Sequence, residues 1–398
     1  MTTKITGSMI AQKTIGRENL SDSVLSGKST EATGFRRMQN PFVGPTVRTA
    51  DAYRRKDINP VIEAQPGDNF VADPFAIVVP EHGGEDGRVY VFYEAFVYND
   101  PHVSSQGRIK VSYTDDGENF TLGNSGSPVV NELPDYHSAY PQVFRVHDTF
   151  YMAVSGASLP GNVNDVRFYK TTLANFPTGW TPVGRPAALN TFGGSSDFDY
   201  SGLADFTFFQ ANGQWCCIYG GTNSSRQKPG FAVNLSSDLE NLARWFKQDR
   251  AAGWTSSDPR PGFVLPSSGM GHNMRPGGDV IQISENGFVC FMQANSSALY
   301  NQGQSVVLGL FQKGPRPNDY YEQMAWNTDG QTGAILPYLS PTGENGDWDK
   351  TAVHHLSFVH FKSKWLGFYD GRNHDEVLEN GQAGPWRIGL VELPAVMP

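Results

Sequence analysis

The fold is indicated by the stretch 205–220, which reads Asp205-Phe-Thr-Phe-Phe-Gln-Ala-Asn-Gly-Gln-Trp-Cys-Cys-Ile-Tyr-Gly220. A polar residue precedes an apolar run, the pair Asn212-Gly213 follows, and a second apolar run ends on a small residue. Asn-Gly between two apolar runs is the strongest short-range signal for a β-hairpin. The stretch is therefore predicted to form two antiparallel strands with a polar residue at the beginning of the first.

This hairpin unit recurs five times along the chain, at spacings of 65 to 79 residues. The five copies begin at Asp73, Tyr140, Asp205, Arg275 and His354, and their second runs end at Glu94, Ser155, Gly220, Gln293 and Asp370. Self-similarity at such a period is typical of propellers and other repeat folds. A β-sandwich with accidental spacing is the alternative to a repeat fold.

Two further apolar runs follow most hairpins. Third strands are expected at 108–113, 166–170, 230–234, 305–310 and 387–391, and fourth strands at 128–130, 186–189, 262–265 and 333–336. The fifth unit lacks a fourth strand, and residues 59–62 are expected to supply it, which would close the ring and remove an exposed edge. The sequence thus predicts an all-β, five-bladed β-propeller over residues 46–398 with a short N-terminal extension.

Composition excludes several classes of function. The chain of 398 residues carries a net charge of −9, so a basic groove for nucleic acid is not expected. No apolar stretch approaches the ~20 residues of a membrane span, and the N-terminus lacks the apolar core of a signal peptide. The three cysteines lie in apolar runs without metal spacing, which predicts buried reduced thiols. We expect no cofactor, no membrane insertion and synthesis in a cytosol.

Polar residues are expected to gather where the hairpins begin and end, because these positions lie at one face of a propeller. Four of the ten positions are carboxylates, although only 18% of the chain is charged. A protonated carboxyl beside an ionised one is what glycosidic cleavage needs. Asp73 is expected to be the ionised base or nucleophile, with Asp205 or Glu94 as the acid. Substrate contacts are expected from Tyr140, Gln142, Arg275, Gln293, His354, His355 and Asp370.

The adjacent histidines His354 and His355 should point to opposite sides of a strand, so that only one faces the site. The sequence does not indicate which one. No third ligand stands at zinc spacing, so no metal is predicted. Residues suited to sugar contacts flank the ring, although any one of them alone is better explained by packing; they are Tyr136, His137, Phe192, Phe198, Tyr200, Trp254, Asn273 and Tyr300.

Several of these motifs resemble known carbohydrate-processing propellers. Val71-Ala-Asp-Pro-Phe75 with Phe92-Tyr-Glu-Ala95 is similar to the first blade of the five-bladed glycoside hydrolase superfamily typified by family 43. The chain more closely resembles the N-terminal propeller of glucosamine inositolphosphorylceramide transferases. The shared pieces include 107–117, 138–144, 176–180, 275–278, Gln293 with Tyr300 and Gly303, and His354-His355.

The family 43 resemblance implies a general base at Asp73, a carboxylate in the second blade that tunes pKa, and a glutamic acid in the third. The sequence departs from this pattern twice. Tyr140-Pro-Gln142 stands in place of the second carboxylate, and the shorter Asp205 stands near the expected glutamate. The resemblance therefore implies a carbohydrate as partner, with either cleavage or binding.

Residues 1–45 consist of short apolar patches between polar residues and resemble the attachment and trimerisation segments of phage tail fibres and tailspikes. This resemblance implies a homotrimer on a virion tail that binds and hydrolyses a bacterial surface polysaccharide. A disordered leader is the alternative for the segment itself. For the whole chain, the alternatives are a non-catalytic receptor-binding protein and a free bacterial glycoside hydrolase.

Overall fold

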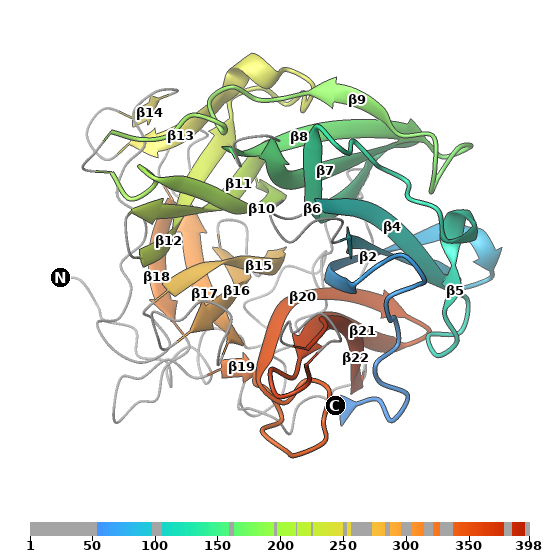
Figure 1. Cartoon of the computed structure of the whole chain (residues 1–398). Helices are drawn as coiled ribbons and strands as arrows, with labels where there is room; N and C mark the ends of the chain where they lie inside the picture. The colour runs from blue at the N-terminus through green and yellow to red at the C-terminus, as the bar shows by residue number, and fades with distance from the viewer. Residues whose placement is uncertain are drawn as a thin grey trace, which may run out of the picture. The chain divides into compact units, whose positions relative to one another are not determined.

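The computed structural model describes residues 54–97, 106–158, 163–194, 197–211, 213–223, 226–249, 253–255, 273–282, 287–295, 304–313, 321–326, 337–377 and 384–394. The predicted segment 1–45 lies outside these residues. Within them the secondary structure consists of antiparallel strands (Figure 1), with short 3₁₀ turns at Gly123–Gly126 and Leu242–Arg244 and no α-helix. No described helix is long and apolar enough to cross a membrane. The all-β prediction is confirmed.

The chain divides into two compact units. The first unit comprises Tyr53–Arg185 with Pro341–Val396 and holds blades 1, 2 and 5. Blade 1 consists of β2 (Phe70–Gly84), β3 (Gly87–Val97), β4 (Gln106–Thr114) and β5 (Thr121–Leu122). Blade 2 consists of β6 (Tyr136–Val146), β7 (Thr149–Ser158), β8 (Val163–Thr172) and β9 (Thr181–Gly184). Blade 5 consists of β20 (Ala352–Phe361), β21 (Lys364–Arg372), β22 (Arg387–Pro394) and β1 (Arg54–Arg55).

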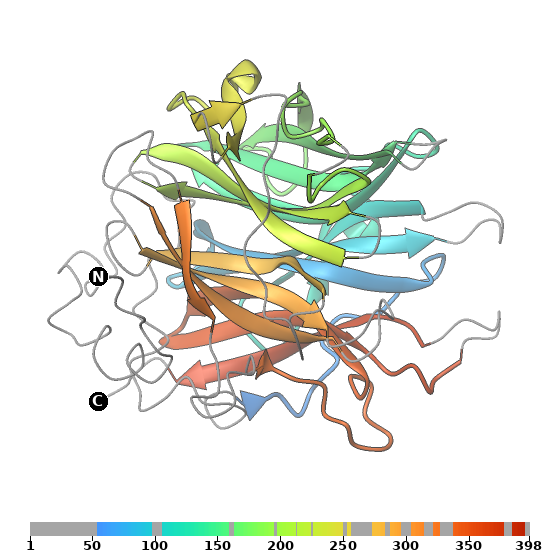
Figure 2. The same cartoon turned by 90° about the vertical axis from the view of Figure 1, so that its left-hand side faces the viewer.

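The second unit covers Pro186–Ser340 and holds blades 3 and 4. Blade 3 consists of β10 (Gly202–Ala211), β11 (Gln214–Asn223), β12 (Arg226–Asn234), β13 (Trp245–Asp249) and β14 (Gly253–Thr255). Blade 4 consists of β15 (Asn273–Gln282), β16 (Gly287–Asn295), β17 (Ser305–Lys313), β18 (Tyr321–Trp326) and β19 (Pro337–Leu339). In each blade the first two long strands pair as an antiparallel hairpin (Figure 2), so all five predicted hairpins are confirmed.

The fourth strands differ from the prediction. The predicted run 186–189 is not a strand, because residues 187–190 form a turn, and the outer strand of blade 2 is β9, which pairs with β8. In blade 1 the outer strand is β5, while Val130 makes only an isolated bridge with Ile109. The predicted runs 262–265 and 333–336 lie outside the described residues. Outer strands are short and half exposed, so apolar runs are a poor guide to their bounds.

An N-terminal strand completes blade 5, as predicted, but it is β1, which pairs with β22 and lies before the predicted residues 59–62. Ile62 forms an antiparallel bridge with Ile388, in which the Ile388 N–H donates to the Ile62 carbonyl at 3.0 Å. Asn59 extends this ladder, because its side chain both accepts from the Leu390 N–H at 2.7 Å and donates to the Leu390 carbonyl at 3.0 Å. The edge of the last strand is thereby covered by a segment more than 300 residues away in sequence.

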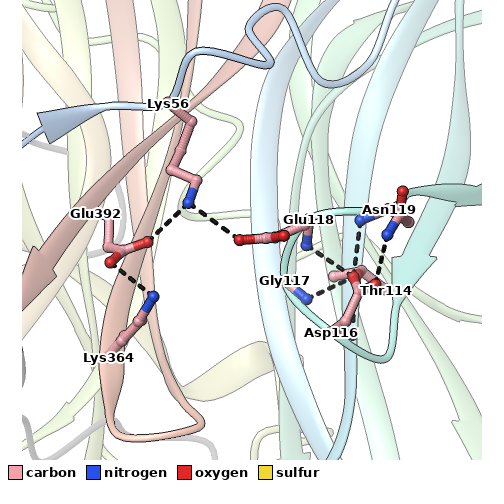
Figure 3. A network of polar contacts seen from close by, with 8 residues as sticks. All are labelled: Lys56, Thr114, Asp116, Gly117, Glu118, Asn119, Lys364 and Glu392. Atoms are coloured by element: carbon pink, nitrogen blue, oxygen red, sulfur yellow. Dashed lines mark hydrogen bonds and ion pairs between the residues drawn. The ribbon is translucent and has the colours of Figure 1, made fainter.

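A polar network lies beside this closure (Figure 3). Lys56 contacts Glu118 of blade 1 at 3.3 Å and Glu392 of blade 5 at 3.1 Å, and Lys364 pairs with Glu392 at 2.9 Å. Asp116 fixes the turn that carries Glu118, because its carboxylate accepts from the backbone N–H groups of Glu118 and Asn119. These pairs are partly exposed, so each contributes little to stability, and the apolar core and backbone ladder carry the closure.

Apolar faces of neighbouring blades make the core within each unit. In the first unit, Phe92 and Phe150 belong to one buried cluster, and Val91 and Phe368 belong to another. In the second unit, the core includes Cys216 and Cys290 among aromatic and aliphatic side chains. All three cysteines are buried and free of disulfides, which confirms the prediction for them.

Ion pairs with a buried aspartate tie the segment before the first strand of three blades to an outer strand of the same blade. Asp68 binds Lys110 at 2.6 Å in blade 1, Asp199 binds Lys247 at 2.9 Å in blade 3, and Asp349 binds Arg55 at 2.9 Å in blade 5. In blades 3 and 5 a tyrosine of the second strand also donates to the aspartate, from Tyr219 at 3.2 Å and Tyr369 at 2.8 Å. Each tyrosine directly precedes a predicted ring position, Gly220 or Asp370, and so helps to hold that part of the strand.

Replacing Lys247 with methionine should lower the free energy of unfolding by about 3–5 kcal/mol, because it leaves the Asp199 carboxylate buried without its cation. Neither side chain of this pair is exposed, and Lys247 also donates to the Thr191 carbonyl at 2.6 Å. Lys350→Met is the matched control, since its partner Asp375 is exposed and such pairs contribute at most about 1 kcal/mol. Urea unfolding of both variants checks this; equal losses would contradict it.

Candidate functional site

The predicted ring positions lie on a backbone irregularity that the blades share. Asp73, Tyr140, Asp205 and His355 have positive φ angles of 55°, 45°, 48° and 26°. Each lies where the register of its first strand shifts against the second. Non-glycine residues seldom adopt this conformation, and β-bulges that re-aim a side chain are common beside functional sites. The bulges therefore support the choice of these positions.

The structure also corrects the alignment of the repeats. Ala72 pairs with Glu94, Ala139 with Ser155 and Ala204 with Gly220, so Asp73, Tyr140 and Asp205 each follow a paired residue. The residues that pair in blades 4 and 5 are Arg275 with Gln293 and His354 with Asp370. Arg275 and His354 are thus offset by one residue from the other three, and the blade 5 equivalent of Asp73 is His355.

An acid–histidine cluster lies in the first unit; we define it as Asp73, Glu94, His137, Tyr140, His354, His355 and Asp370. At its centre, His355 Nδ1 lies 2.9 Å from Asp73 Oδ1 and 3.1 Å from Asp370 Oδ1. Burial alone would lower the pKa of His355, but the charges of Asp73 and Asp370 outweigh it and raise that pKa to about 10. The ring is therefore a cation at neutral pH, held between two carboxylates.

Both histidines reach Asp370, which corrects the expectation that they point to opposite sides. The bulge at His355 interrupts the alternation of the strand, and His354 Nδ1 lies 3.5 Å from the second oxygen of Asp370. The His354 ring packs on Trp386 with centroids 4.1 Å apart, whereas the His355 ring packs on Tyr140 at 4.9 Å. Of the two histidines, His355 contacts the predicted catalytic Asp73.

Three side chains that could together hold a metal ion lie in the same place, a grouping that the sequence did not predict. Within the described part of the chain, His354, His355 and Asp370 offer ligand atoms that lie within 4.8 Å of one another. Asp370 was overlooked as a third ligand because it comes from the neighbouring strand rather than from nearby sequence. His355 Nδ1 contacts both carboxylates through its proton. A metal ion would have to displace this proton to bind that nitrogen.

Glu94 has a different partner from Asp73. His137 Nε2 lies 3.6 Å from Glu94 Oε1, and the Gly107 N–H donates to His137 Nδ1 at 2.6 Å. Burial lowers the pKa of His137 to about 4, so this ring is neutral at pH 7. Two carboxylates of one blade therefore face opposite surroundings: Asp73 faces a cationic imidazole and Glu94 a neutral one.

An arginine cluster of Asp205, Arg275 and Gln293 lies in the second unit. Arg275 Nε lies 2.6 Å from Asp205 Oδ2, and Gln293 Nε2 donates to the same oxygen at 3.0 Å. All three side chains are buried. A guanidinium at this distance stabilises the ionised carboxylate, which makes Asp205 poorly suited to serve as an acid and leaves Glu94 as the better candidate.

Gln142 and the residues that flank the ring positions differ in their exposure. Gln142 is buried further along β6, opposite Ala153. Tyr136 and Phe198 are buried core residues, in agreement with the packing explanation. The Arg167 guanidinium carbon lies 3.7 Å from the centre of the Tyr136 ring, and the ring centres of Phe198 and Tyr219 lie 5.6 Å apart. Phe192 and Tyr200 are exposed. Tyr300 and the side chains of Trp254 and Asn273 lie outside the described residues.

Comparison with known proteins gives a partial family match. The sequence profile of the N-terminal domain of glucosamine inositolphosphorylceramide transferase 1 matches residues 58–183, which cover blades 1 and 2. The predicted resemblance to this domain is confirmed for those residues. We find no match among curated proteins.

Solved structures with the same fold are glycoside-processing propellers. A putative glycoside hydrolase from Parabacteroides distasonis has a TM-score of 0.58 at 14% identity, covering 89% of this chain and 99% of its own. A β-1,2-mannobiose phosphorylase from Listeria innocua has a TM-score of 0.57 at 13% identity, covering 86% and 97%. A member of the GH130 family of mannoside phosphorylases and hydrolases has 0.59 at 14% identity, covering 88% and 97%. The predicted five-bladed β-propeller is confirmed.

The His355→Asn variant should lose stability in a pH-dependent manner. A pKa raised from 6.5 to about 10 on folding contributes stability that is complete below pH 6.5 and disappears as the pH rises through 10. The difference in unfolding free energy between wild type and variant should therefore be largest near pH 6 and shrink toward pH 10. Urea titrations at both pH values check this, with His360→Asn on the same strand as control. A difference that does not change with pH would show that His355 is not held as a cation.

Proposed function

We propose that this chain cleaves glycosidic bonds, with Asp73 as the base or nucleophile and Glu94 as the acid. The observation that carries the proposal is the contrast between these two carboxylates on neighbouring strands of blade 1. A carboxylate beside a cation and a carboxyl beside a neutral group are the pair that glycoside cleavage uses. The glycosidase fold and the partial match to a sugar transferase domain support the same reading.

The proposed residues act as follows. Glu94 donates its proton to the glycosidic oxygen, and the leaving sugar departs as an alcohol. Asp73 either takes a proton from the attacking water or attacks the sugar carbon itself. His355 occupies Oδ1 of Asp73, so Oδ2 would perform this step. Tyr140, packed on His355, would offer a ring face to the sugar.

Water and phosphate are both possible acceptors for this chemistry. One similar structure is a β-1,2-mannobiose phosphorylase, and another is described as belonging to a family whose hydrolases target β-1,2-mannosidic linkages in Candida mannan. We propose water as the acceptor, because the similar structures include putative glycoside hydrolases from Parabacteroides distasonis and Bacteroides ovatus. Product release that requires inorganic phosphate would instead identify a phosphorylase.

Asp73→Asn and Glu94→Gln should each lower the release of reducing ends by roughly 10²–10⁴-fold, since each removes one acid–base group. The assay uses a panel of bacterial surface polysaccharides and β-mannosides, with and without phosphate. Asp148→Asn is the control, because Asp148 lies in the same unit with its side chain 87% exposed. Full activity in both site variants would refute the assignment. Binding without release by wild type would favour a non-catalytic receptor-binding protein.

The N-terminal segment supports a proposal about context. The resemblance of residues 1–45 to phage tail segments favours a homotrimer attached to a virion tail and made in the host cytoplasm, with a bacterial surface polysaccharide as substrate. A free bacterial hydrolase has the same site without this attachment, and the comparisons favour it over the tail protein, because the similar structures described above are glycosidases and a phosphorylase and the family match is to a sugar transferase domain.

Deleting residues 1–45 distinguishes these two contexts. If the segment trimerises the protein, the full chain should elute as a trimer and the truncated chain as a folded monomer with unchanged activity. Size-exclusion chromatography with light scattering measures both masses. A full chain that is monomeric, or a truncated chain that is still trimeric, would contradict the trimerisation role.

A further inference from the structure

His137 is held in one tautomer by the backbone of blade 1. The Gly107 N–H donates to His137 Nδ1 at 2.6 Å, so that nitrogen presents its lone pair. A neutral imidazole has one donor and one acceptor nitrogen, and the proton must therefore lie on Nε2. With its pKa lowered to about 4 by burial, the ring keeps this neutral form at pH 7.

The proton on Nε2 faces the side chain of Glu94. His137 Nε2 and Glu94 Oε1 lie 3.6 Å apart, and the two side chains are only 13% and 7% exposed. The Phe96 ring meets the His137 ring edge to face, with centroids 5.8 Å apart. The histidine therefore has one fixed ring plane, with its donor directed at one oxygen of the candidate acid.

The close packing of His137 beside Glu94 requires glycine at position 107. A Cβ there would lie 2.5 Å from Glu94 Oε1, 2.6 Å from the Ser138 carbonyl and 2.8 Å from His137 Cε1. Neither the backbone carbonyl nor the buried ring can move away without disturbing its strand. Three strands of two blades, β3, β4 and β6, thus meet at a point that only glycine permits.

We propose that His137 is a positioning residue for Glu94, an inference that rests on the proposed function. Its Nε2–H is directed at Glu94 Oε1 across 3.6 Å, longer than a hydrogen bond, and would donate once substrate binding draws the two groups together. Oε2 is then left to carry the acid proton and to face the glycosidic oxygen. During cleavage the proton passes from Oε2 to the departing sugar oxygen, and Glu94 becomes a carboxylate. His137 keeps its own proton throughout, and its donor stabilises the charge that forms on Glu94.

Two substitutions separate this role from simple packing. His137→Gln keeps an amide N–H near the former Nε2, so it can still donate to Glu94. His137→Asn keeps an acceptor for the Gly107 N–H but is too short to reach Glu94. We expect the Asn variant to lose 10–100-fold in kcat with little change in KM, the range typical of residues that orient a catalytic group. The Gln variant should recover most of that loss, and thermal unfolding shows that both variants fold.

The outcomes distinguish the inference from the proposed function. Equal losses in both variants, or no loss in either while Glu94→Gln is inactive, would overturn the role of His137 and leave the function intact. An active Glu94→Gln would instead refute the function. A readout independent of activity is ¹⁵N NMR of labelled histidines, with His137 assigned through its Asn variant. The inference requires the neutral Nε2–H tautomer at pH 7; the Nδ1–H tautomer or an imidazolium would contradict it.

Discussion

The candidate site depends on one constraint, the bulge that places a non-glycine residue in the left-handed conformation within the first strand of four blades. Each such residue costs of order 1–3 kcal/mol, so it persists only where the surrounding structure holds it. Here the hairpin ladders resume on both sides of every bulge, and the ion pairs of blades 3 and 5 hold the partner strands. The strain is local, whereas the apolar core that supports it extends over each unit.

Side chains of the same type acquire different properties because their neighbours differ. Asp73 and Glu94 lie on paired strands, yet one contacts a cationic imidazole and the other a neutral one. The two histidines differ for a simple reason: His355 has carboxylates on its Nδ1, whereas His137 accepts a backbone N–H there. Asp205, bound by Arg275, belongs with the ionised groups. The chemistry proposed for the site follows from these partners rather than from the residue types alone.

The hairpins could be predicted from the sequence, because two long apolar runs around a turn leave a clear pattern. The closure by an N-terminal segment could also be predicted, since the last unit visibly lacks a strand, although the strand itself is Arg54–Arg55. The outer strand of blade 2 could not, because Thr181–Gly184 has few apolar residues to mark it. The Asp199–Lys247 pair was missed for another reason: its members lie far apart in sequence and become partners only in the folded blade.

The repeat predicted which residues form the candidate site, but it did not predict how their side chains are arranged. Strict alternation of side chains predicted that His354 and His355 point apart, and the bulge removes that alternation. His137 was noted only as a flanking residue, since nothing in its local sequence indicates that Gly107 fixes its tautomer. Bulges and cross-blade contacts arise from tertiary packing, so a periodic pattern in one sequence cannot reveal them.

The central claim is that a sugar binds at the bulged residues of blades 1, 2 and 5, and a crystal structure with bound oligosaccharide tests it most directly. The Glu94→Gln variant, soaked with an oligosaccharide that the wild type cleaves or binds, keeps the site intact while preventing turnover. The account predicts a sugar ring against Tyr140, with its scissile oxygen beside residue 94 and its anomeric carbon facing Asp73. A sugar bound elsewhere, with Asp73 and Tyr140 untouched, would contradict it.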